Sequence, residues 1–123
     1  MIELTTPKDA VRLRRLALSS QGLTQSHSFG RGVAGARKAI AHLGYVQIDT
    51  ISVVERAHLH VLHSRVPTFE PAMLDQLLVG GDVFEYWSHA AAFYPSKIIV
   101  FLCLTSRPLK VAKPTGIKIQ TAH

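Results

Sequence analysis

One short segment constrains the fold of this chain more than any other. Residues 45–50 read Tyr-Val-Gln-Ile-Asp-Thr and follow a stretch with helical apolar spacing. Successive side chains point to opposite faces of a strand, so Gln47 and Asp49 share one face and the apolar residues around them share the other. The segment therefore predicts a strand that is apolar on one side and polar on the other. A carboxylate on such a strand needs a binding partner or a function, because burying an unpaired charge costs free energy.

Two interpretations of Asp49 are open at this point. In the structural one, its carboxylate accepts hydrogen bonds from backbone amides of the turn at residues 50–53, as an Asp at a strand end often does. In the chemical one, Gln47 and Asp49, roughly 7 Å apart along the strand, act together on one water or one sugar ring. Spacing alone favours the structural interpretation.

Helical patterns flank the strand. A first helix begins at Thr6 and Pro7 and ends near Gly22, with an apolar stripe at Ala10, Leu13, Leu16 and Ala17. Apolar spacing predicts a second helix over 33–43, favours a third within 55–65, and predicts a fourth that opens at Pro71.

Residues 83–95 are rich in aromatics and bounded by turn residues, which indicates a β-hairpin. Helices, a short strand, a helix pair and then a hairpin follow the order of a winged helix-turn-helix unit. The predicted fold class is therefore α+β and mainly α, a winged helix-turn-helix domain with a C-terminal β-hairpin wing.

The basic charge is concentrated in the tail. The chain has 123 residues, enough for one domain, with 14 basic and 8 acidic residues and a net charge of +6. All the acids lie before residue 96, whereas Lys97, Arg107, Lys110, Lys113 and Lys118 follow it without any acid. The net charge of the chain therefore says little about what residues 1–95 bind. We expect residues 1–95 to form the domain and residues 96–123 to be an unrelated or disordered basic tail.

The single cysteine, Cys103, cannot form a disulfide within the chain, so it reads as an inert hydrophobe of a cytoplasmic protein. The first residues have no apolar stretch typical of a secretory signal, and the longest apolar run, residues 98–104, is too short to span a bilayer. We expect no membrane partner.

Several runs together resemble a known family. They are residues 43–58 (Leu-Gly-Tyr-Val-Gln-Ile-Asp-Thr-Ile-Ser-Val-Val-Glu-Arg-Ala-His), 64–65, 73–78 and 84–91, with residues 13–17 and 21–23 in the first helix region. In this order and spacing, over roughly residues 8–95, they resemble the AlkZ/YcaQ-type winged-helix DNA glycosylases. Members of that family are much longer, with tandem winged-helix units around a DNA channel, and they release alkylated bases, including bases in interstrand crosslinks.

The resemblance implies a catalytic pair. The family signature is Gln, an apolar residue, then Gln or Asp; here it reads Gln47-Ile48-Asp49, the variant of the crosslink branch. Cleaving an N-glycosidic bond builds positive charge on the sugar, which a fixed carboxylate stabilises. Asp49 would do this and take a proton from water, and Gln47 would orient the water or the backbone. The resemblance thus reverses the preference for a structural Asp49. It implies no cofactor and, as partner, double-stranded DNA carrying alkylated or crosslinked bases.

The resemblance is lost near residue 96. An unrelated reading frame or a truncated gene would produce such a tail, and a genuine basic arm is the alternative. A truncated chain would lack the units that grip DNA, so it could be an inactive remnant of the enzyme.

Five further residues are candidates for DNA contact. They are Arg56 and Arg65, which alternatively pair with acids, and Tyr86, Trp87 and His89, which alternatively pack in the core. We expect no metal site at His58, His60 and His63, because no cysteine or carboxylate nearby completes a ligand set. The alternative function is a winged-helix DNA-binding protein without catalysis, although the helix at 71–79 has no Arg or Lys with which to read bases.

Overall fold

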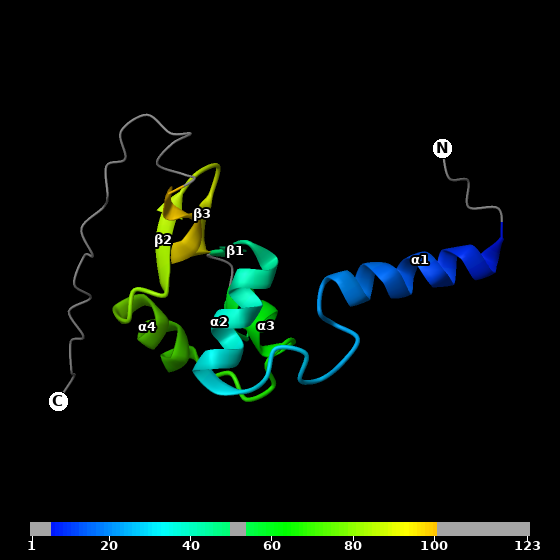
Figure 1. Ribbon diagram of the computed structural model, residues 1–123, viewed down its shortest axis with the longest axis horizontal. Coiled ribbons are helices and arrows are strands. Elements are labelled where there is room, and N and C mark those ends of the chain that lie inside the picture. The colour runs from blue at the N-terminus through cyan, green and yellow to red at the C-terminus, as the bar shows by residue number, and fades with distance from the viewer. Residues whose placement is uncertain (1–5, 50–53, 101–123) are drawn as a thin grey trace.

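The computed structural model describes residues 6–49 and 54–100. The elements are α1 (Pro7–Ser20), α2 (Gly32–Leu43), β1 (Val46–Gln47), α3 (Ala57–His63), α4 (Pro71–Val79), β2 (Val83–Trp87), β3 (Ala91–Pro95) and a short 3-10 helix, η1 (Ser96–Ile98) (Figure 1). The expectations for the turn at 50–53 and for most of the basic tail, Cys103 included, lie outside the described residues. No helix within the described ranges is long and apolar enough to cross a membrane.

Helix α1 begins as its sequence predicts. The Thr6 side chain accepts from the backbone N–H of Asp9, and the Asp9 carboxylate accepts from that of Thr6, so both ends of a capping box are present. Pro7 occupies the first turn, where its missing N–H costs nothing. The helix is capped at Gln21, and Gly22 turns the chain with φ of +69°.

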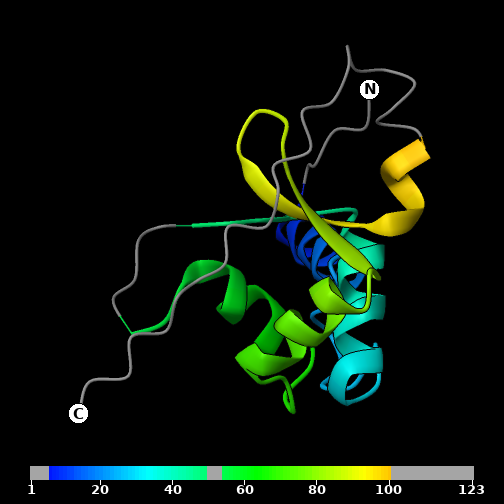
Figure 2. The same cartoon turned by 90° about the vertical axis from the view of Figure 1, so that its left-hand side faces the viewer.

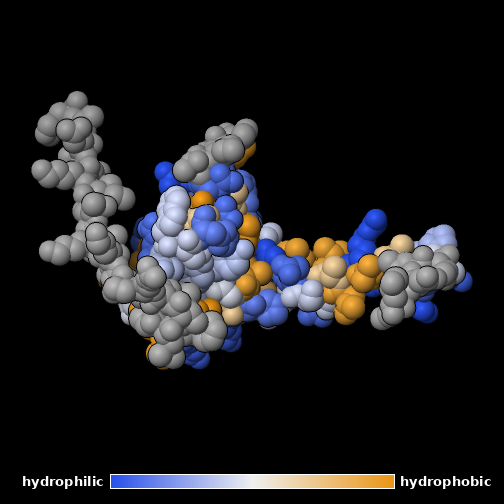
Figure 3. All heavy atoms as spheres, turned by 90° about the horizontal axis from the view of Figure 1, so that it is seen from above, coloured by the Kyte–Doolittle hydropathy of each residue, from blue (hydrophilic) through white to orange (hydrophobic). Residues whose placement is uncertain are grey.

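The apolar stripe of α1 does not meet a core. Within the described structure no residue of α1 is buried, and Leu16 on the stripe is 66% exposed. The helix projects away from the rest of the molecule (Figure 1), and its apolar side chains lie at the surface beside basic ones (Figure 3). The body of the domain holds α1 at its C-terminal end, where a ring nitrogen of His42 lies 2.7 Å from the Ser20 carbonyl oxygen and Arg65 donates to the Gln21 carbonyl.

We therefore expect α1 to be the least stable helix of the chain. An isolated helix of this length is marginal in water, because helices shorter than about 12–15 residues rarely repay the cost of nucleation without tertiary packing. Amide hydrogen exchange should show weak protection across residues 10–20 and strong protection in α2. Equal protection in the two helices would show that α1 packs against something in solution.

The other elements share one hydrophobic core. Ile40 of α2, Leu62 of α3, Leu77 of α4 and Val83 of β2 are essentially inaccessible to solvent. Helices α2, α3 and α4 lie on one side of the small sheet (Figure 2). Of the apolar positions that helical spacing predicts in α2, Ala36 and Ile40 are buried in this core, whereas Val33 and Leu43 pack partly buried against it.

The sheet has three antiparallel strands in the order β1-β3-β2. β2 and β3 form the predicted hairpin, and β1 pairs with β3 through Val46 opposite Phe93 and Gln47 opposite Ala92. The strand expected over residues 45–49 is shorter than predicted, because only Val46 and Gln47 lie opposite residues of β3. A further hydrogen bond from the Ile48 amide to the Ala91 carbonyl, 2.8 Å, still holds the chain to the sheet.

These elements form a winged-helix domain, mainly α with a small antiparallel sheet. Three helices pack together and the β2–β3 hairpin, the wing, follows the last of them. The predicted fold class is confirmed. This topology puts the end of β1 beside α3, which brings the polar face of the strand next to the helix that carries His58.

Candidate active site

A cavity of about 600 Å³ lies between β1 and α3. Its lining includes Tyr45, Gln47 and Asp49 from β1 and its flanks, and His58 and Arg65 from the α3 region. We call it the β1–α3 cavity. Both residues of the predicted catalytic pair therefore face the same hollow, as the alternation along the strand requires.

The two members of the pair have different surroundings. Gln47 is exposed, Asp49 is half-buried, and Val46 between the two polar neighbours Tyr45 and Gln47 is buried in the core. The alternation predicted from the sequence is thus present. Whether Asp49 also caps the turn at residues 50–53 depends on residues outside the described part. Asp49 is close enough to His58 for its charge to raise the pKa of that imidazole.

His58 is buried at the cavity wall, with only 5% of its surface exposed. Its ring meets the ring of Phe93 edge-on, with centroids 5.6 Å apart. Burial and the charge of Arg56 lower the pKa of His58, and the carboxylates of Asp49 and Glu55 oppose this without cancelling it. The imidazole is therefore neutral at neutral pH.

This lowered pKa makes stability depend on pH. Below the ordinary pKa of 6.5 the unfolded chain takes up a proton at His58 that the folded chain does not. Stability should therefore be complete above that pH and should fall as the pH drops from it toward the lower folded pKa. Denaturant unfolding at neutral pH and at about pH 5.5 measures this loss.

The matched controls are His58→Leu and His63→Leu. The first should remove most of the loss, because the titrating group is gone. The second should leave it in place, since His63 is an exposed residue of the same helix. A loss that survives His58→Leu would assign the pH dependence to another group.

Arg65 is the second buried polar residue of the cavity, 6% exposed. Its Nε donates to the Gln21 carbonyl at 2.9 Å and its Nη1 to the Val61 carbonyl at 2.9 Å. Burial lowers its pKa, yet a guanidinium keeps its charge at any physiological pH. The ion pairs Arg12–Asp9 and Arg37–Asp82 do not involve Arg65. The guanidinium of Arg65 and the carboxylate of Asp49 line the same cavity.

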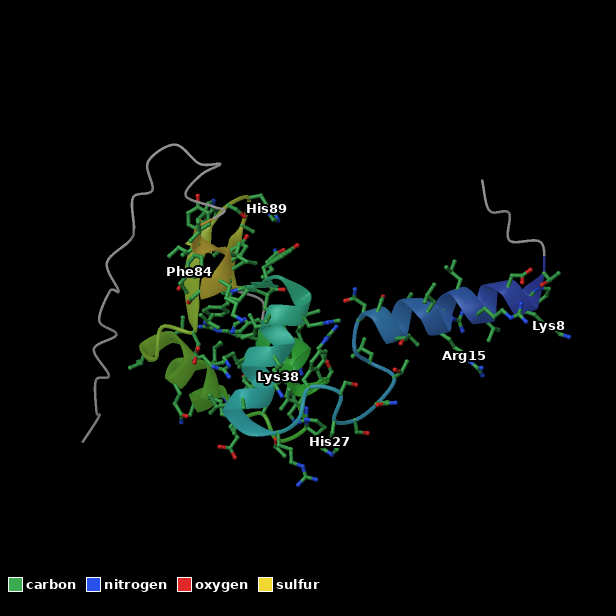
Figure 4. The ribbon with its side chains drawn as sticks, viewed as in Figure 1. Lys8, Arg15, His27, Lys38, Phe84 and His89 are labelled. Carbon is green, nitrogen blue, oxygen red and sulfur yellow. The ribbon has the colours of Figure 1, made fainter. Side chains whose placement is uncertain are left out.

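Three of the other candidates for DNA contact lie on the wing, and Arg56 lies at the start of α3. Trp87 is 70% exposed at the end of β2, and His89 lies at the tip of the hairpin (Figure 4). Neither packs in the core. Tyr86 is half-buried against Tyr94, and Arg56 is exposed just before α3. Of the five, the structure brings only Arg65 into the cavity.

Aromatic contacts connect the wing to the cavity. Tyr94 of β3 stacks on Phe84 and on Tyr45, with centroids 5.9 and 5.7 Å apart. Tyr45 also meets the ring of His89 edge-on at 6.0 Å. The hairpin tip therefore lies against a residue of the cavity lining.

The histidines of α3 line two different hollows. No group of three or more His, Cys, Asp or Glu side chains in the described ranges could hold a metal ion. His60 and His63 instead line a smaller hollow of about 270 Å³ with Leu59 and Phe69. His58 faces the β1–α3 cavity on the other side of the helix, as helical spacing requires.

The family model described as DNA glycosylase AlkZ-like matches residues 40–118, which is more than half of the chain. The chain belongs to the AlkZ-like DNA glycosylase family. The match contains β1, α3, α4 and the wing, and hence nearly all of the cavity lining. No solved structure matches the chain.

The matched range also continues past the hairpin. It reaches residue 118 and so includes part of the segment for which we expected no counterpart. The domain boundary at residue 95 stays a prediction, as does the origin of the tail.

Two polar residues of the cavity lining, His58 and Gln21, were not among the site residues predicted from the sequence. His58 was considered only as a metal ligand, and Gln21 only as part of the first helix region. A single histidine in a short helix gives no periodic signal, and Gln21 comes near Arg65 only because the chain folds back across 44 residues. Neither placement could be found before the topology was known.

Proposed function

We propose that the β1–α3 cavity is the active site of a DNA glycosylase that hydrolyses the N-glycosidic bond of alkylated bases. The observation that carries this proposal is the shared placement of Gln47 and Asp49 in one solvent-connected cavity. Membership of the AlkZ-like family supports a DNA substrate. The lesion we propose is guanine alkylated at N7, alone or as part of an interstrand crosslink.

The reaction needs little beyond a placed carboxylate. The oxygen of a water molecule forms a bond to C1′ of the deoxyribose, and the bond from C1′ to N9 of the base breaks. Its electron pair passes to the base, which leaves as neutral N7-alkylguanine. Asp49 stabilises the positive charge that builds on the sugar and takes the proton that the water loses. An N7-alkylated base is already cationic, so it leaves without a strong general acid.

The remaining residues have roles that follow from their exposure. Gln47 is exposed at the cavity edge, where the sugar-phosphate backbone would lie, so we assign it to the backbone. Arg65 contributes positive charge to the cavity wall, which favours the approach of the anionic DNA backbone. Trp87 and His89 are exposed on the wing and would contact the duplex beside the lesion. Tyr86 and Arg56 are secondary candidates for the same contact.

The direct test measures release of N7-methylguanine from a duplex by detecting the abasic sites that the release leaves in the DNA. The assay uses two proteins. One is a chimera in which residues 1–95 of this chain replace the corresponding part of a longer family member, and the other is the 123-residue chain itself. Release that requires Asp49 supports the proposal. DNA binding by both proteins without any release would instead favour the non-catalytic winged-helix protein.

That alternative has one observation against it. In a sequence-reading winged-helix protein the helix before the wing enters the major groove. Here this helix is α4, whose exposed residues include Asp75 and Gln76 but no Arg or Lys. Its apolar residues Leu74 and Leu77 are buried in the core. The helix is therefore better suited to packing than to reading bases.

A further inference from the structure

Tyr45 is a surface aromatic residue to which the proposed reaction gives no role. Its side chain is 42% exposed, and it does not belong to the hydrophobic core of the domain. It comes two residues before Gln47 in the chain and is one of the residues that line the β1–α3 cavity. Tyr45 therefore lies beside the candidate active site, within reach of DNA that is bound there.

The ring of Tyr45 is held by two rings of the wing. It stacks on the ring of Tyr94 in β3, with centroids 5.7 Å apart and planes inclined by 22°. The ring of His89 meets it edge-on, with centroids 6.0 Å apart. Stacked and edge-on contacts between aromatic rings both favour a defined orientation. The exposed ring therefore has a preferred position beside the cavity.

Tyr94, the residue on which Tyr45 stacks, is itself firmly placed. It is only 8% exposed, and its ring stacks on that of Phe84 at 5.9 Å. Its hydroxyl lies 2.8 Å from the Ser88 hydroxyl, whose oxygen is also 3.0 Å from Nδ1 of His89. One hydrogen-bonded network thus supports both neighbours of the Tyr45 ring. Support of this kind preorganises an exposed side chain for binding.

The surroundings of Tyr45 indicate a nucleobase as the group that its ring meets. Trp87 and His89, our proposed DNA contacts, lie on the hairpin against which Tyr45 packs. A flat aromatic ring binds another flat ring by stacking, and every base offers such a face whatever the sequence. Stacking therefore suits a protein that acts on damage in any sequence context.

Spacing along the chain indicates which base this is. Tyr45 and Asp49 are four residues apart, which corresponds to roughly 13 Å in an extended segment. Successive nucleotides of a strand are spaced by only about 3.4 Å along the axis of a duplex. With Asp49 at the sugar of the lesion, Tyr45 lies beyond that sugar, on the side of a neighbouring nucleotide.

We propose that Tyr45 stacks on the base beside the gap that forms when the alkylated base leaves. In an intact duplex, stacked neighbours cover both faces of that base, whereas an abasic site uncovers one of them. The Tyr45 ring replaces the lost stacking partner, so the protein prefers the abasic product to intact DNA. This inference rests on the proposed glycosylase function and adds to it a residue that binds the product.

Binding to a duplex with one stable abasic site, a tetrahydrofuran residue, tests the inference without any base release. The 123-residue chain is titrated beyond about 10⁻⁴ M, the weak end of non-specific DNA binding, against this duplex and against an intact one. Tyr45→Leu should lower affinity for the abasic duplex on the order of tenfold, as expected for the loss of one base–aromatic stack. Affinity for the intact duplex should stay unchanged, which also shows that the variant is folded.

Tyr45→Phe is the matched control, because it keeps the ring and removes only the hydroxyl. It should bind the abasic duplex as tightly as the natural chain does. An equal loss in Tyr45→Phe and Tyr45→Leu would show that the hydroxyl makes the contact, for example to a phosphate, and would overturn the stacking. A 2-aminopurine beside the abasic site reports stacking directly. Its fluorescence should fall when the natural chain binds and should stay high with Tyr45→Leu.

The release assay separates this inference from the proposed function. If Asp49→Asn slows release while Tyr45→Leu binds the abasic duplex as tightly as the natural chain, only the inference fails. If Asp49→Asn leaves release unchanged, the proposed catalytic role fails, and the binding of Tyr45→Leu still decides the stacking. An equal loss of affinity for both duplexes in Tyr45→Leu, or no binding of the abasic duplex by the natural chain, would also overturn the inference.

Discussion

Asp49→Asn is expected to slow release of N7-alkylguanine by about 10² or more. Asparagine keeps the shape of the side chain but removes the negative charge that faces the sugar cation and the group that accepts the proton from water. A placed charge of this kind is worth roughly 3 kcal/mol in the transition state, which corresponds to that loss of rate. Single-turnover kinetics on a duplex with one N7-methylguanine measure it, with the full-length family protein that carries residues 1–95 of this chain.

The matched control is Asp75→Asn, the same change at an exposed position of α4 outside the cavity. It should leave the rate unchanged. Affinity for the lesion duplex should change little in either variant, because the charge acts in the transition state. An Asp49→Asn protein that releases base at the normal rate would return Asp49 to the structural interpretation, as a cap of the turn that follows β1.

The 123-residue chain by itself is expected to release base at a rate near background. One winged-helix unit offers a small surface to a duplex, so the lesion would not be held with C1′ close to the attacking water. The same single-turnover assay compares the short chain with the full-length protein. Robust release by the short chain that depends on Asp49 would show that one unit is enough.

Local signals in the sequence predicted most of the fold. The capping residues at Thr6 and Pro7 and the turn glycine after α1 mark helix ends through hydrogen bonds and φ angles that act within a few residues. The hairpin is equally local. The length of β1 was not predicted, because it depends on how many residues of β3 lie opposite it, and that is set by the packing of distant segments.

The candidate site was predicted only in part, because some of its residues come together through the packing of distant segments. Period-two alternation placed Gln47 and Asp49 on one face, and both line the cavity. His58 and Arg65 join them only through the packing of α3 beside β1, and Arg65 is held by the backbone carbonyls of Gln21 and Val61. Backbone carbonyls occur at every residue, so no pattern of side chains marks this partner in advance.

Leu62→Ala should cause the largest loss of stability among simple core changes. Leu62 is completely buried in α3, and removing its branched end leaves a cavity that its neighbours cannot fully close, at a cost of about 3 kcal/mol. For a body of this size such a loss is a large fraction of the total and would lower the melting temperature by roughly 10–20 °C. Thermal and urea unfolding followed by circular dichroism measure both quantities.

The control makes the same substitution at an exposed leucine. Leu16 of α1 is 66% exposed, so Leu16→Ala should change the free energy of unfolding by less than about 0.5 kcal/mol. The contrast also bears on the site, because Leu62 anchors the helix that presents His58 and Arg65 to the cavity. Partial unfolding of α3 in Leu62→Ala would therefore abolish base release by the full-length protein, even though Leu62 does not line the cavity. Equal stability of the two variants would mean that α3 does not pack in the core in solution, and the β1–α3 cavity would then lose the wall on which the proposed chemistry depends.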